Sequence, residues 1–134
     1  MNNKVVHLRC IVEGSARASA VVTAQPIAFL KGVDPESGTI IDPKHELHGV
    51  CFTGKILVFP NAVGSSVGAY VIYRLERSGS APKAIINQRS DIITASGCAI
   101  AGIPLYDMPE DSIKEFKSGT TLVINGRKSE VRVL

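Results

Sequence analysis

Two adjacent serines in a glycine-rich turn are the residues of this sequence best placed to do chemistry. Gly64, Ser65, Ser66 and Gly68 follow an apolar segment that Pro60 ends, and they precede a segment with helical periodicity. We therefore expect both hydroxyls at the first turn of a helix, where backbone N–H groups lack partners and the helix dipole is positive. Gly64 allows a sharp turn, and the position would suit an anion such as a carboxylate, a phosphate or a serine alkoxide.

The same turn also has a purely structural interpretation. Ser65 could simply cap the helix, which would stabilise the helix by about 1 kcal/mol. A nucleotide-binding loop is excluded, because no Gly-Lys-Ser or Gly-Lys-Thr sequence follows Gly64.

A catalytic role for Ser65 would need positive charge from outside the turn. A helix dipole contributes at most ~2 kcal/mol, and one pKa unit corresponds to about 1.4 kcal/mol, so the helix end alone shifts the pKa of a hydroxyl by about one unit. A serine hydroxyl is far too weak an acid for that shift to make it a base at neutral pH. The remaining charge must come from a metal ion or from basic side chains.

The chain itself offers no convincing metal site. Cys10, Cys51 and Cys98 lie far apart in the sequence and lack the spacing of cluster ligands. His45-x-x-His48 has no obvious third ligand, and a solvated turn is the other interpretation of these two histidines. We therefore expect no metal bound by this chain, and we expect a partner to complete the site.

Composition predicts a single cytoplasmic domain spanning residues 1–134. Of the 134 residues, 45% are hydrophobic, which is enough for one core. No apolar run approaches the ~18 residues of a membrane span, and no signal peptide is evident. An odd number of scattered cysteines fits a reducing compartment. The net charge of +3 arises from scattered Lys and Arg, without the basic stripe and stacking aromatics of a nucleic-acid binder.

Apolar periodicity predicts a mixed α/β domain that is mostly β, with one principal helix starting near Ser65. Val67, Val71 and Leu75 recur at helical spacing, and Gly79 is placed to end the helix in a left-handed conformation. The predicted strands cover residues 4–12, 18–24, 55–59, 84–86, 91–95, 99–104, 120–124 and 128–134.

Three connecting segments complete this prediction. Asn125-Gly126 favours a tight type I′ hairpin turn between the last two strands. Residues 32–49 form a long, turn-rich loop, and such loops in compact domains are usually functional or disordered. Residues 109–116 predict a second, short helical turn.

Three blocks of the sequence resemble a known family. They are residues 32–49, residues 54–75 with the Gly64-Ser65-Ser66 turn, and residues 79–107. Together they resemble the small subunit of the aconitase X group, and most closely its archaeal branch, the phosphomevalonate dehydratases. The resemblance covers nearly the whole chain.

The resemblance implies a fold, a partner and a reaction. The fold is the swivelling β/β/α domain of aconitases. The partner is a large subunit that holds a [4Fe-4S] cluster through its cysteines, so the active enzyme is a heterodimer or a higher assembly. The reaction is the loss of water from (R)-5-phosphomevalonate, which gives trans-anhydromevalonate 5-phosphate in an archaeal mevalonate route to isoprenoids. Ser65 is then the proton acceptor, and Gly64 and Ser66 contact the substrate.

The sequence departs from the pattern of related enzymes at two places. Val67 stands where aconitase has an arginine, so substrate-anion binding by that arginine cannot be carried over. Ala62-Val63-Gly64 replaces the Gly-Arg-Gly lead-in of fused bacterial relatives, which argues against hydroxyproline-type substrates.

Other candidate contacts keep two interpretations each. Lys83 and Lys55 are candidate phosphate partners or solvated lysines. Asp34 and His45 could line the site from the long loop, although Asp34 before Pro35 is also a normal turn residue. Two alternative functions remain open: the small subunit of a hydroxyproline-type dehydratase, and a non-catalytic β-rich binding module whose Gly-Ser-Ser turn merely caps a helix.

Overall fold

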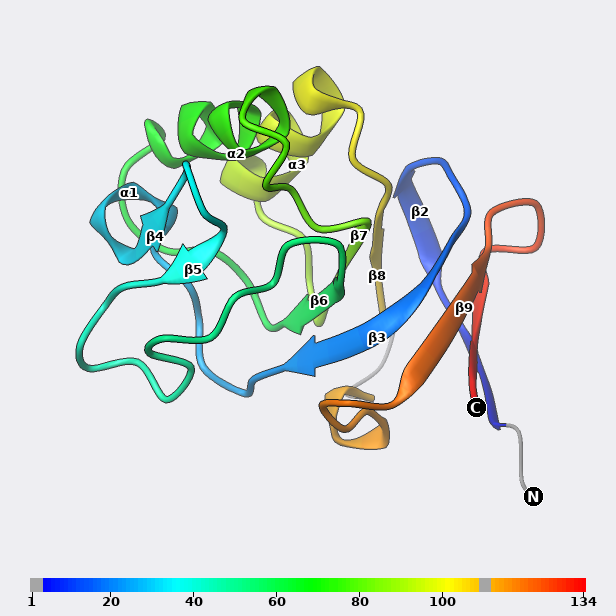
Figure 1. Ribbon diagram of the computed structural model, residues 1–134. Helices are drawn as coiled ribbons and strands as arrows, with labels where there is room; N and C mark the ends of the chain where they lie inside the picture. Colours follow the sequence, from blue (N-terminus) through cyan, green and yellow to red (C-terminus); the bar gives the residue numbers. More distant parts are fainter. Residues whose placement is uncertain (1–3, 109–111) are drawn as a thin grey trace.

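An eight-stranded sheet organises the domain in the computed structural model, which describes residues 4–108 and 112–134 (Figure 1). The strand order is β1-β10-β9-β3-β6-β7-β8-β2. The strands are β1 Lys4–His7, β2 Arg9–Val12, β3 Ala16–Val22, β6 Ile56–Phe59, β7 Ala84–Asn87, β8 Leu105–Asp107, β9 Thr121–Asn125 and β10 Glu130–Val133. Neighbours within the set β3, β6, β7 and β8 are parallel, and the other pairs are antiparallel.

The two ends of this strand order are joined by a single residue. Leu8 alone separates β1 from β2, although β1 pairs with β10 and β2 pairs with β8. The sheet therefore has to curl until its two edges nearly meet. The prediction of one continuous strand over residues 4–12 is wrong at Leu8, because the chain passes there from one edge of the sheet to the other.

The curled sheet separates two hydrophobic cores. Along β6, Ile56 and Val58 belong to the core that they share with residues of β1, β9 and β10. Leu57 and Phe59 alternate with them and belong to the core beneath the helices. All four residues of β6 are buried, because both faces of the central parallel strands are covered.

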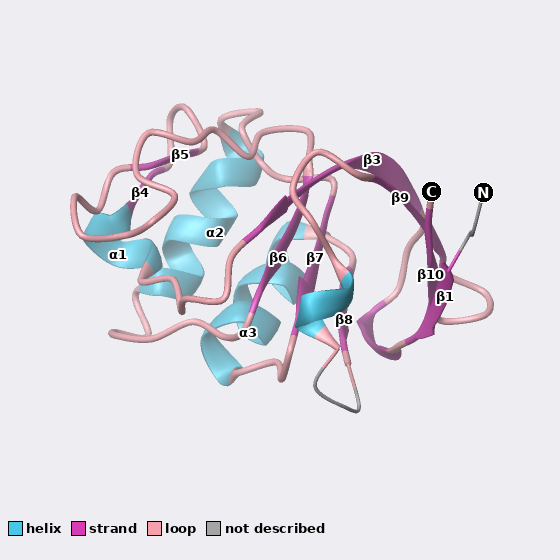
Figure 2. Ribbon diagram, turned by 90° about the horizontal axis from the view of Figure 1, so that it is seen from below, coloured by secondary structure: helices cyan, strands magenta, loops and turns pink. Residues whose placement is uncertain are grey.

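Helices α2, Gly68–Arg77, and α3, Ile92–Ala101, lie together on one face of β6 and β7 (Figures 1 and 2). They approach closely at Gly97, where an added Cβ would lie 2.8 Å from the Ile72 Cβ atom. A single irregular turn, α1 Phe29–Gly32, packs beside the start of α2. The described residues thus contain two helices of ten residues each, α2 and α3, rather than one principal helix.

Helix α3 occupies the region where the sequence predicted strands at residues 91–95 and 99–104, and both predictions are wrong. The β-branched residues Ile92 and Ile93 favour a strand by propensity. Asp91, however, accepts a hydrogen bond from the Thr94 N–H at 2.8 Å and so caps a helix. Gly102, with φ 75°, ends that helix in the left-handed conformation.

Helix α2 ends as predicted but begins later than predicted. At its end Gly79 has φ 73° and donates its N–H to the Glu76 carbonyl at 3.1 Å, while the Ser80 N–H donates to the Leu75 carbonyl at 2.8 Å. Its first residue is Gly68, three residues after Ser65. A tighter turn with i to i+3 hydrogen bonds leads into the helix and contains the serine pair.

The hairpin of β9 and β10 is present, but the predicted type I′ turn at Asn125-Gly126 is wrong. Asn125 pairs with Glu130, so residues 126–129 form a four-residue loop. Ser129, rather than Gly126, takes the positive φ of 48°.

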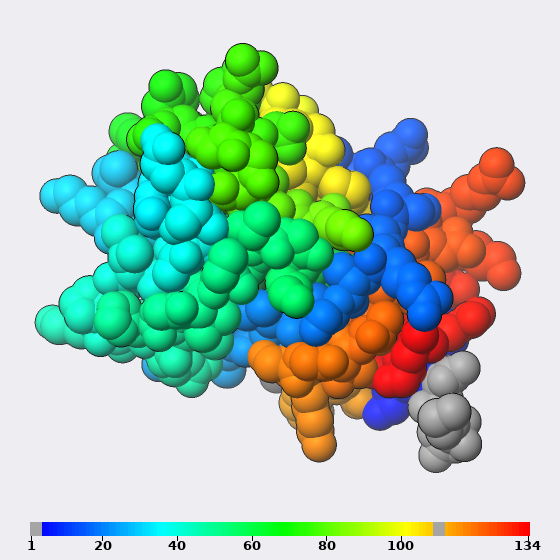
Figure 3. Space-filling model, viewed as in Figure 1, coloured from blue at the N-terminus to red at the C-terminus, as the bar shows by residue number. Residues whose placement is uncertain are grey.

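The long loop predicted at residues 32–49 contains a small hairpin, in which β4 Val33–Asp34 pairs with β5 Thr39–Ile40. Figure 3 shows this segment, coloured cyan to blue-green, spread over one face of the molecule below α2. The helical turn predicted at residues 109–116 is present as η1, Ile113–Glu115, and residues 109–111 lie outside the described residues. No helix of the described ranges is long and apolar enough to cross a membrane.

Candidate functional site

The parallel strands bring three loops to one edge of the sheet. Residues 23–27, 60–67 and 88–91 follow β3, β6 and β7, which run in the same direction side by side. In open α/β sheets, ligands bind outside the carboxyl ends of the strands. The middle loop carries the serine pair, so the structure places the predicted turn at the edge where such sites form.

The serine pair is exposed at this edge. Gly64 has φ 99°, a value that favours glycine, and residues 63–67 are all exposed. The Ser65 Oγ atom accepts a hydrogen bond from the Val67 N–H at 3.1 Å, and α2 itself has no side-chain cap. Ser65 therefore caps the lead-in turn rather than the helix, and among the described residues its hydroxyl donates to no protein group.

Hydrogen bonds from both neighbouring loops hold the segment that precedes the serines. The Ala62 N–H donates to Asp91 Oδ2 at 2.6 Å, and the Val63 N–H donates to the Ile27 carbonyl at 3.0 Å. Asp91 also accepts from the Thr94 hydroxyl at 3.0 Å, in addition to capping α3. The position of the turn is thus fixed by the loops after β3 and β7 together.

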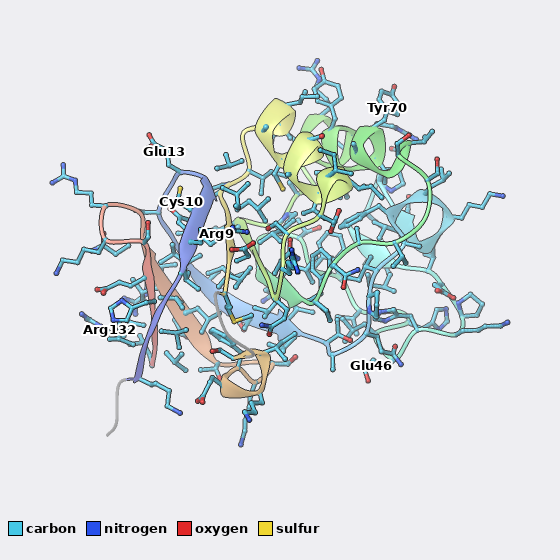
Figure 4. The ribbon with its side chains drawn as sticks, turned by 180° about the vertical axis from the view of Figure 1, so that it is seen from behind. Arg9, Cys10, Glu13, Glu46, Tyr70 and Arg132 are labelled. Carbon is cyan, nitrogen blue, oxygen red and sulfur yellow. The ribbon has the colours of Figure 1, made fainter. Side chains whose placement is uncertain are left out.

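The same edge carries an arginine, held by a buried carboxylate, that was not predicted from the sequence. Arg9, which begins β2, pairs in register with Asp107, which ends β8. The Arg9 guanidinium donates from Nε to Oδ1 at 2.9 Å and from Nη2 to Oδ2 at 2.6 Å, and the Ser90 N–H donates to Oδ2 at 3.0 Å. In Figure 4 the Arg9 side chain points from β2 toward β8. The available signal was Asp107, a charged residue directly after the apolar residues of its strand. The sequence did not show that this strand pairs with the strand that carries Arg9.

The electrostatics of this pair are those of a stable ion pair. Burial raises the pKa of the Asp107 carboxyl, but the hydrogen bonds from Arg9 and from the Ser90 N–H outweigh that effect and leave the pKa below its ordinary value. The hydrogen bond to Asp107 and its negative charge raise the pKa of Arg9. Asp107 therefore stays ionised and fixes the direction of the guanidinium.

Lys83 and Lys55 lie at the opposite edge of the sheet from Ser65. They directly precede β7 and β6, and the Lys83 N–H donates to the Lys55 carbonyl at 2.8 Å. A four-residue strand spans about 13 Å. The structure therefore separates both lysines from the serine turn by about the length of β6.

Asp34 also lies away from the serine turn. Its neighbour Glu36 pairs with Arg74, near the end of α2, at 3.3 Å. Asp34 Oδ2 accepts from the Ser37 hydroxyl at 2.7 Å and Oδ1 from the Glu36 N–H at 3.0 Å, and these contacts lower the pKa of Asp34 below its ordinary value. These local contacts show that Asp34 is a normal turn residue, the second of the two interpretations that its position before Pro35 allowed.

His45 is buried and uses both ring nitrogens. Its Nε2 lies 3.1 Å from the Pro26 carbonyl, and its Nδ1 accepts from the Leu47 N–H at 3.0 Å, so both nitrogens are engaged by the backbone. His45 therefore holds the long loop against the loop after β3, and neither of its ring nitrogens is left to contact a ligand. Within residues 4–108 and 112–134, no three His, Cys, Asp or Glu side chains form a group that could hold a metal ion.

The turn also fits the Gly-x-Ser-x-Gly spacing of hydrolase nucleophile elbows, with Ser66 at the centre and the strand–turn–helix context that such elbows have. A hydrolase of that kind needs a histidine hydrogen-bonded to the serine. Neither serine of the pair makes a hydrogen bond to a histidine in the described part of the chain, and both nitrogens of His45 are engaged elsewhere. The geometry therefore gives Ser66 no histidine partner among the described residues.

Comparison with known proteins places this arrangement in one family. Residues 5–133 match the family described as the aconitase X swivel domain. The chain is 46% identical over 118 residues to the phosphomevalonate dehydratase small subunit of Methanothrix thermoacetophila, covering 88% of this chain and 86% of that one. It is 45% identical to the protein of the same name from Pyrococcus furiosus, covering 94% of this chain and 92% of that one. Among solved structures, the holo form of Thermococcus kodakaraensis aconitase X superposes with a TM-score of 0.92 at 40% identity, covering 98% of both chains.

Proposed function

Because this chain belongs to the aconitase X swivel domain family, we propose that it is the small subunit of a hydro-lyase that dehydrates (R)-5-phosphomevalonate to trans-anhydromevalonate 5-phosphate. The names of its relatives from Methanothrix thermoacetophila and Pyrococcus furiosus support the substrate, since they match the chain over most of its length. The observation that carries the proposal is the exposed serine pair at the carboxyl edge of the parallel strands, held in place by both neighbouring loops.

In this reaction Ser65 accepts the proton from the carbon next to the substrate carboxylate, while the hydroxyl group leaves from the adjacent carbon. The hydroxyl of Ser65 is exposed, and its Oγ accepts one hydrogen bond, from the Val67 N–H. That N–H helps to stabilise negative charge on the oxygen, as does the positive end of α2. Gly64 and Ser66 contact the substrate beside it.

The partner is a large subunit that carries the [4Fe-4S] cluster. This chain does not fit the cluster, because its three cysteines are free and scattered, with Cys98 buried, and no three candidate ligands meet in the described ranges. When bound to the partner, the cluster supplies Lewis-acid assistance to the departing hydroxyl. Free cysteines, two of them exposed, also favour a reducing compartment, the cytoplasm.

The large subunit covers the carboxyl edge of the sheet. Large apolar side chains are exposed around the serine turn, on the loops and first turns of the helices: Leu30, Val63, Val67, Tyr70 and Ile92. Tyr70 points outward from the domain in Figure 4. Exposed apolar side chains around a polar site are expected where a second subunit closes over the substrate and excludes water.

The test is reconstitution of the two subunits. The chain is co-expressed with a large subunit of the family and purified without oxygen, and dehydration of 5-phosphomevalonate is measured for the complex and for each chain alone. Turnover by the complex alone supports a shared site. A stable complex that ignores this substrate but dehydrates hydroxyproline would favour the hydroxyproline-type enzyme, and a failure to associate would favour a non-catalytic binding module.

The Ser65→Ala substitution then tests the catalytic role. Loss of a general base lowers kcat by about 10²–10⁴-fold while the complex still assembles, whereas loss of a cap only lowers the free energy of unfolding by about 1 kcal/mol. Ser66→Ala is the matched control, and we expect it to raise KM more than it lowers kcat. A Ser65→Ala complex with the full rate, or a larger loss of kcat in Ser66→Ala, would refute the assignment to Ser65.

A further inference from the structure

The serine turn has no cation of its own. The substrate of the proposed function carries a carboxylate and a phosphate, and both need positive charge or N–H donors when water is excluded. Val67, directly after the serine pair, is apolar. The cations nearest in the fold must therefore come from loops beside the turn.

The loop after β7 places Arg89 directly beside the segment that leads into the turn. The N–H groups of Gln88 and Arg89 donate to the Pro60 carbonyl at 3.1 and 3.2 Å, at the point where the chain leaves β6. The Arg89 side chain is exposed, and it forms no ion pair with a described residue. Its charge acts on Asp107 without a direct ion pair, so the guanidinium keeps its N–H donors for another acceptor on the loop adjacent to the serine loop.

The braced pair of Arg9 and Asp107 fixes the other side of this loop. Asp107 is only 1% exposed, and its carboxylate binds both Arg9 and the N–H of Ser90, the residue after Arg89. The Arg9 side chain remains 64% exposed. Only its Nε and one Nη2 hydrogen face Asp107, so the two Nη1 hydrogens and the second Nη2 hydrogen are left for another acceptor.

We propose that Arg89, together with the outward edge of the Arg9 guanidinium, binds an oxyanion of the substrate at the carboxyl edge of the sheet. This inference rests on the proposed function and adds its anion subsite. Asp107 neutralises one of the two arginines, so these three groups together carry a net charge of +1. The Asp91 carboxylate on the same loop is occupied by the Ala62 N–H, the Thr94 N–H and the Thr94 hydroxyl. A guanidinium held by a buried carboxylate loses little further freedom on binding, which favours a bidentate contact with phosphate or carboxylate.

Lys31 is the competing cation near the turn. An added Cβ on Gly68 would lie 3.5 Å from the Phe29 Cβ atom and 3.9 Å from the Leu30 nitrogen, so α1 abuts the start of α2. No described carboxylate pairs with Lys31, and its ammonium is a mobile point charge rather than a fixed fork. The Arg9 guanidinium is held by Asp107 and the Arg89 backbone is held by the Pro60 carbonyl, which favours the two arginines over Lys31.

The experiment uses the reconstituted complex with Arg89→Ala, Arg89→Lys, Lys31→Ala and, as a matched control, Arg77→Ala. Arg77 is an exposed arginine at the far end of α2, so its removal changes the net charge equally without touching the edge. The measurements are kcat and KM for 5-phosphomevalonate, the inhibition constant of mevalonate, which lacks the phosphate, and the affinity for inorganic phosphate by calorimetry.

We expect Arg89→Ala to lower kcat/KM by about 10–100-fold, mainly through KM, with partial recovery in Arg89→Lys and less than about a twofold change in Arg77→Ala. If the bound oxyanion is the phosphate, Arg89→Ala weakens phosphate binding and leaves mevalonate inhibition unchanged. If the bound oxyanion is the carboxylate, Arg89→Ala weakens the inhibition by mevalonate in addition to the binding of inorganic phosphate.

Three results would overturn the inference: an unchanged KM in Arg89→Ala, a larger loss in Lys31→Ala, or a loss in Arg89→Ala that disappears when subunit association is driven to completion. A wild-type complex without turnover would instead refute the proposed function. In that case calorimetry still decides the subsite, because phosphate affinity must fall in Arg89→Ala and not in Arg77→Ala.

Discussion

The hydrogen bond between Asp91 and the Ala62 N–H is the contact whose loss should most directly disturb the serine turn. Asp91→Asn keeps an oxygen that can accept from the Thr94 N–H, so the cap of α3 is retained, but its NH₂ group then faces the Ala62 N–H. A hydrogen bond to a charged group contributes about 1.5–3 kcal/mol. For a domain of this size that corresponds to a fall in Tm of roughly 5–15 °C.

The same substitution should also lower kcat, because Ala62 lies three residues before Ser65. A displacement of about 1 Å at a reacting group can reduce the rate by about 10²-fold, and we expect a loss of at least about 10-fold with little change in KM. Asp91→Ser, which can cap α3 but is too short to reach Ala62, should behave like Asp91→Asn. Turnover of the reconstituted complex and thermal unfolding of each variant are the two assays.

Thr94→Val is the matched control for Asp91. It removes the hydroxyl that donates to Asp91 Oδ2 at 3.0 Å but leaves the bond to the Ala62 N–H in place. Its kcat should therefore stay close to that of the wild type, although Thr94 is buried and stability falls somewhat. If Asp91→Asn kept both the Tm and the kcat of the wild type, the Asp91–Ala62 contact would not be what positions the turn.

Two further predictions follow from the placement of charges. Because the pKa of Asp107 is lowered in the folded state, its contribution to stability is present above its unfolded pKa of about 3.9 and is lost as the pH falls through the lower folded value. The difference in free energy of unfolding between the wild type and Asp107→Asn should therefore shrink as the pH falls below about 4, and a difference that stays constant in urea titrations from about pH 6 to about pH 3 would contradict this. Lys83→Ala should leave the KM for 5-phosphomevalonate unchanged, since Lys83 precedes β7 at the opposite edge from Ser65; a rise in KM of about 10-fold or more would return Lys83 to the phosphate site.

The parts of the fold that the sequence predicted are those set by local signals. The apolar run at residues 55–59 predicted β6, and Gly79 predicted the end of α2. Both signals are local, because a run of apolar residues and a glycine in the left-handed conformation each determine the structure of only a few neighbouring residues. Helix α3 was missed because its β-branched first turn has strand propensity, while the features that decide for a helix are the cap at Asp91 and the close packing at Gly97.

In the candidate site, too, only the residues that belong to a local sequence pattern could be predicted. Ser65 could be found from the sequence because strand, glycine turn and helix are contiguous. Arg9 and Asp107 could not, because they are 98 residues apart and meet only through the pairing of β2 with β8. That pairing depends on the curl of the whole sheet, which no local pattern encodes.

The direction of α2 explains why we expect the substrate at only one end of the helical layer. The end that Asp34 and Lys83 flank is the carboxyl end of α2, where the helix dipole is negative and Arg74 already pairs with Glu36. An anion there would meet the wrong end of the dipole and would have to displace an acidic side chain. At the other end the dipole is positive, the serine hydroxyls are exposed, and Arg89 forms no ion pair with a described residue, although its charge acts on Asp107. We therefore expect a substrate with two negative groups to bind at the serine edge, with the cations that the described residues do not supply there coming from the large subunit.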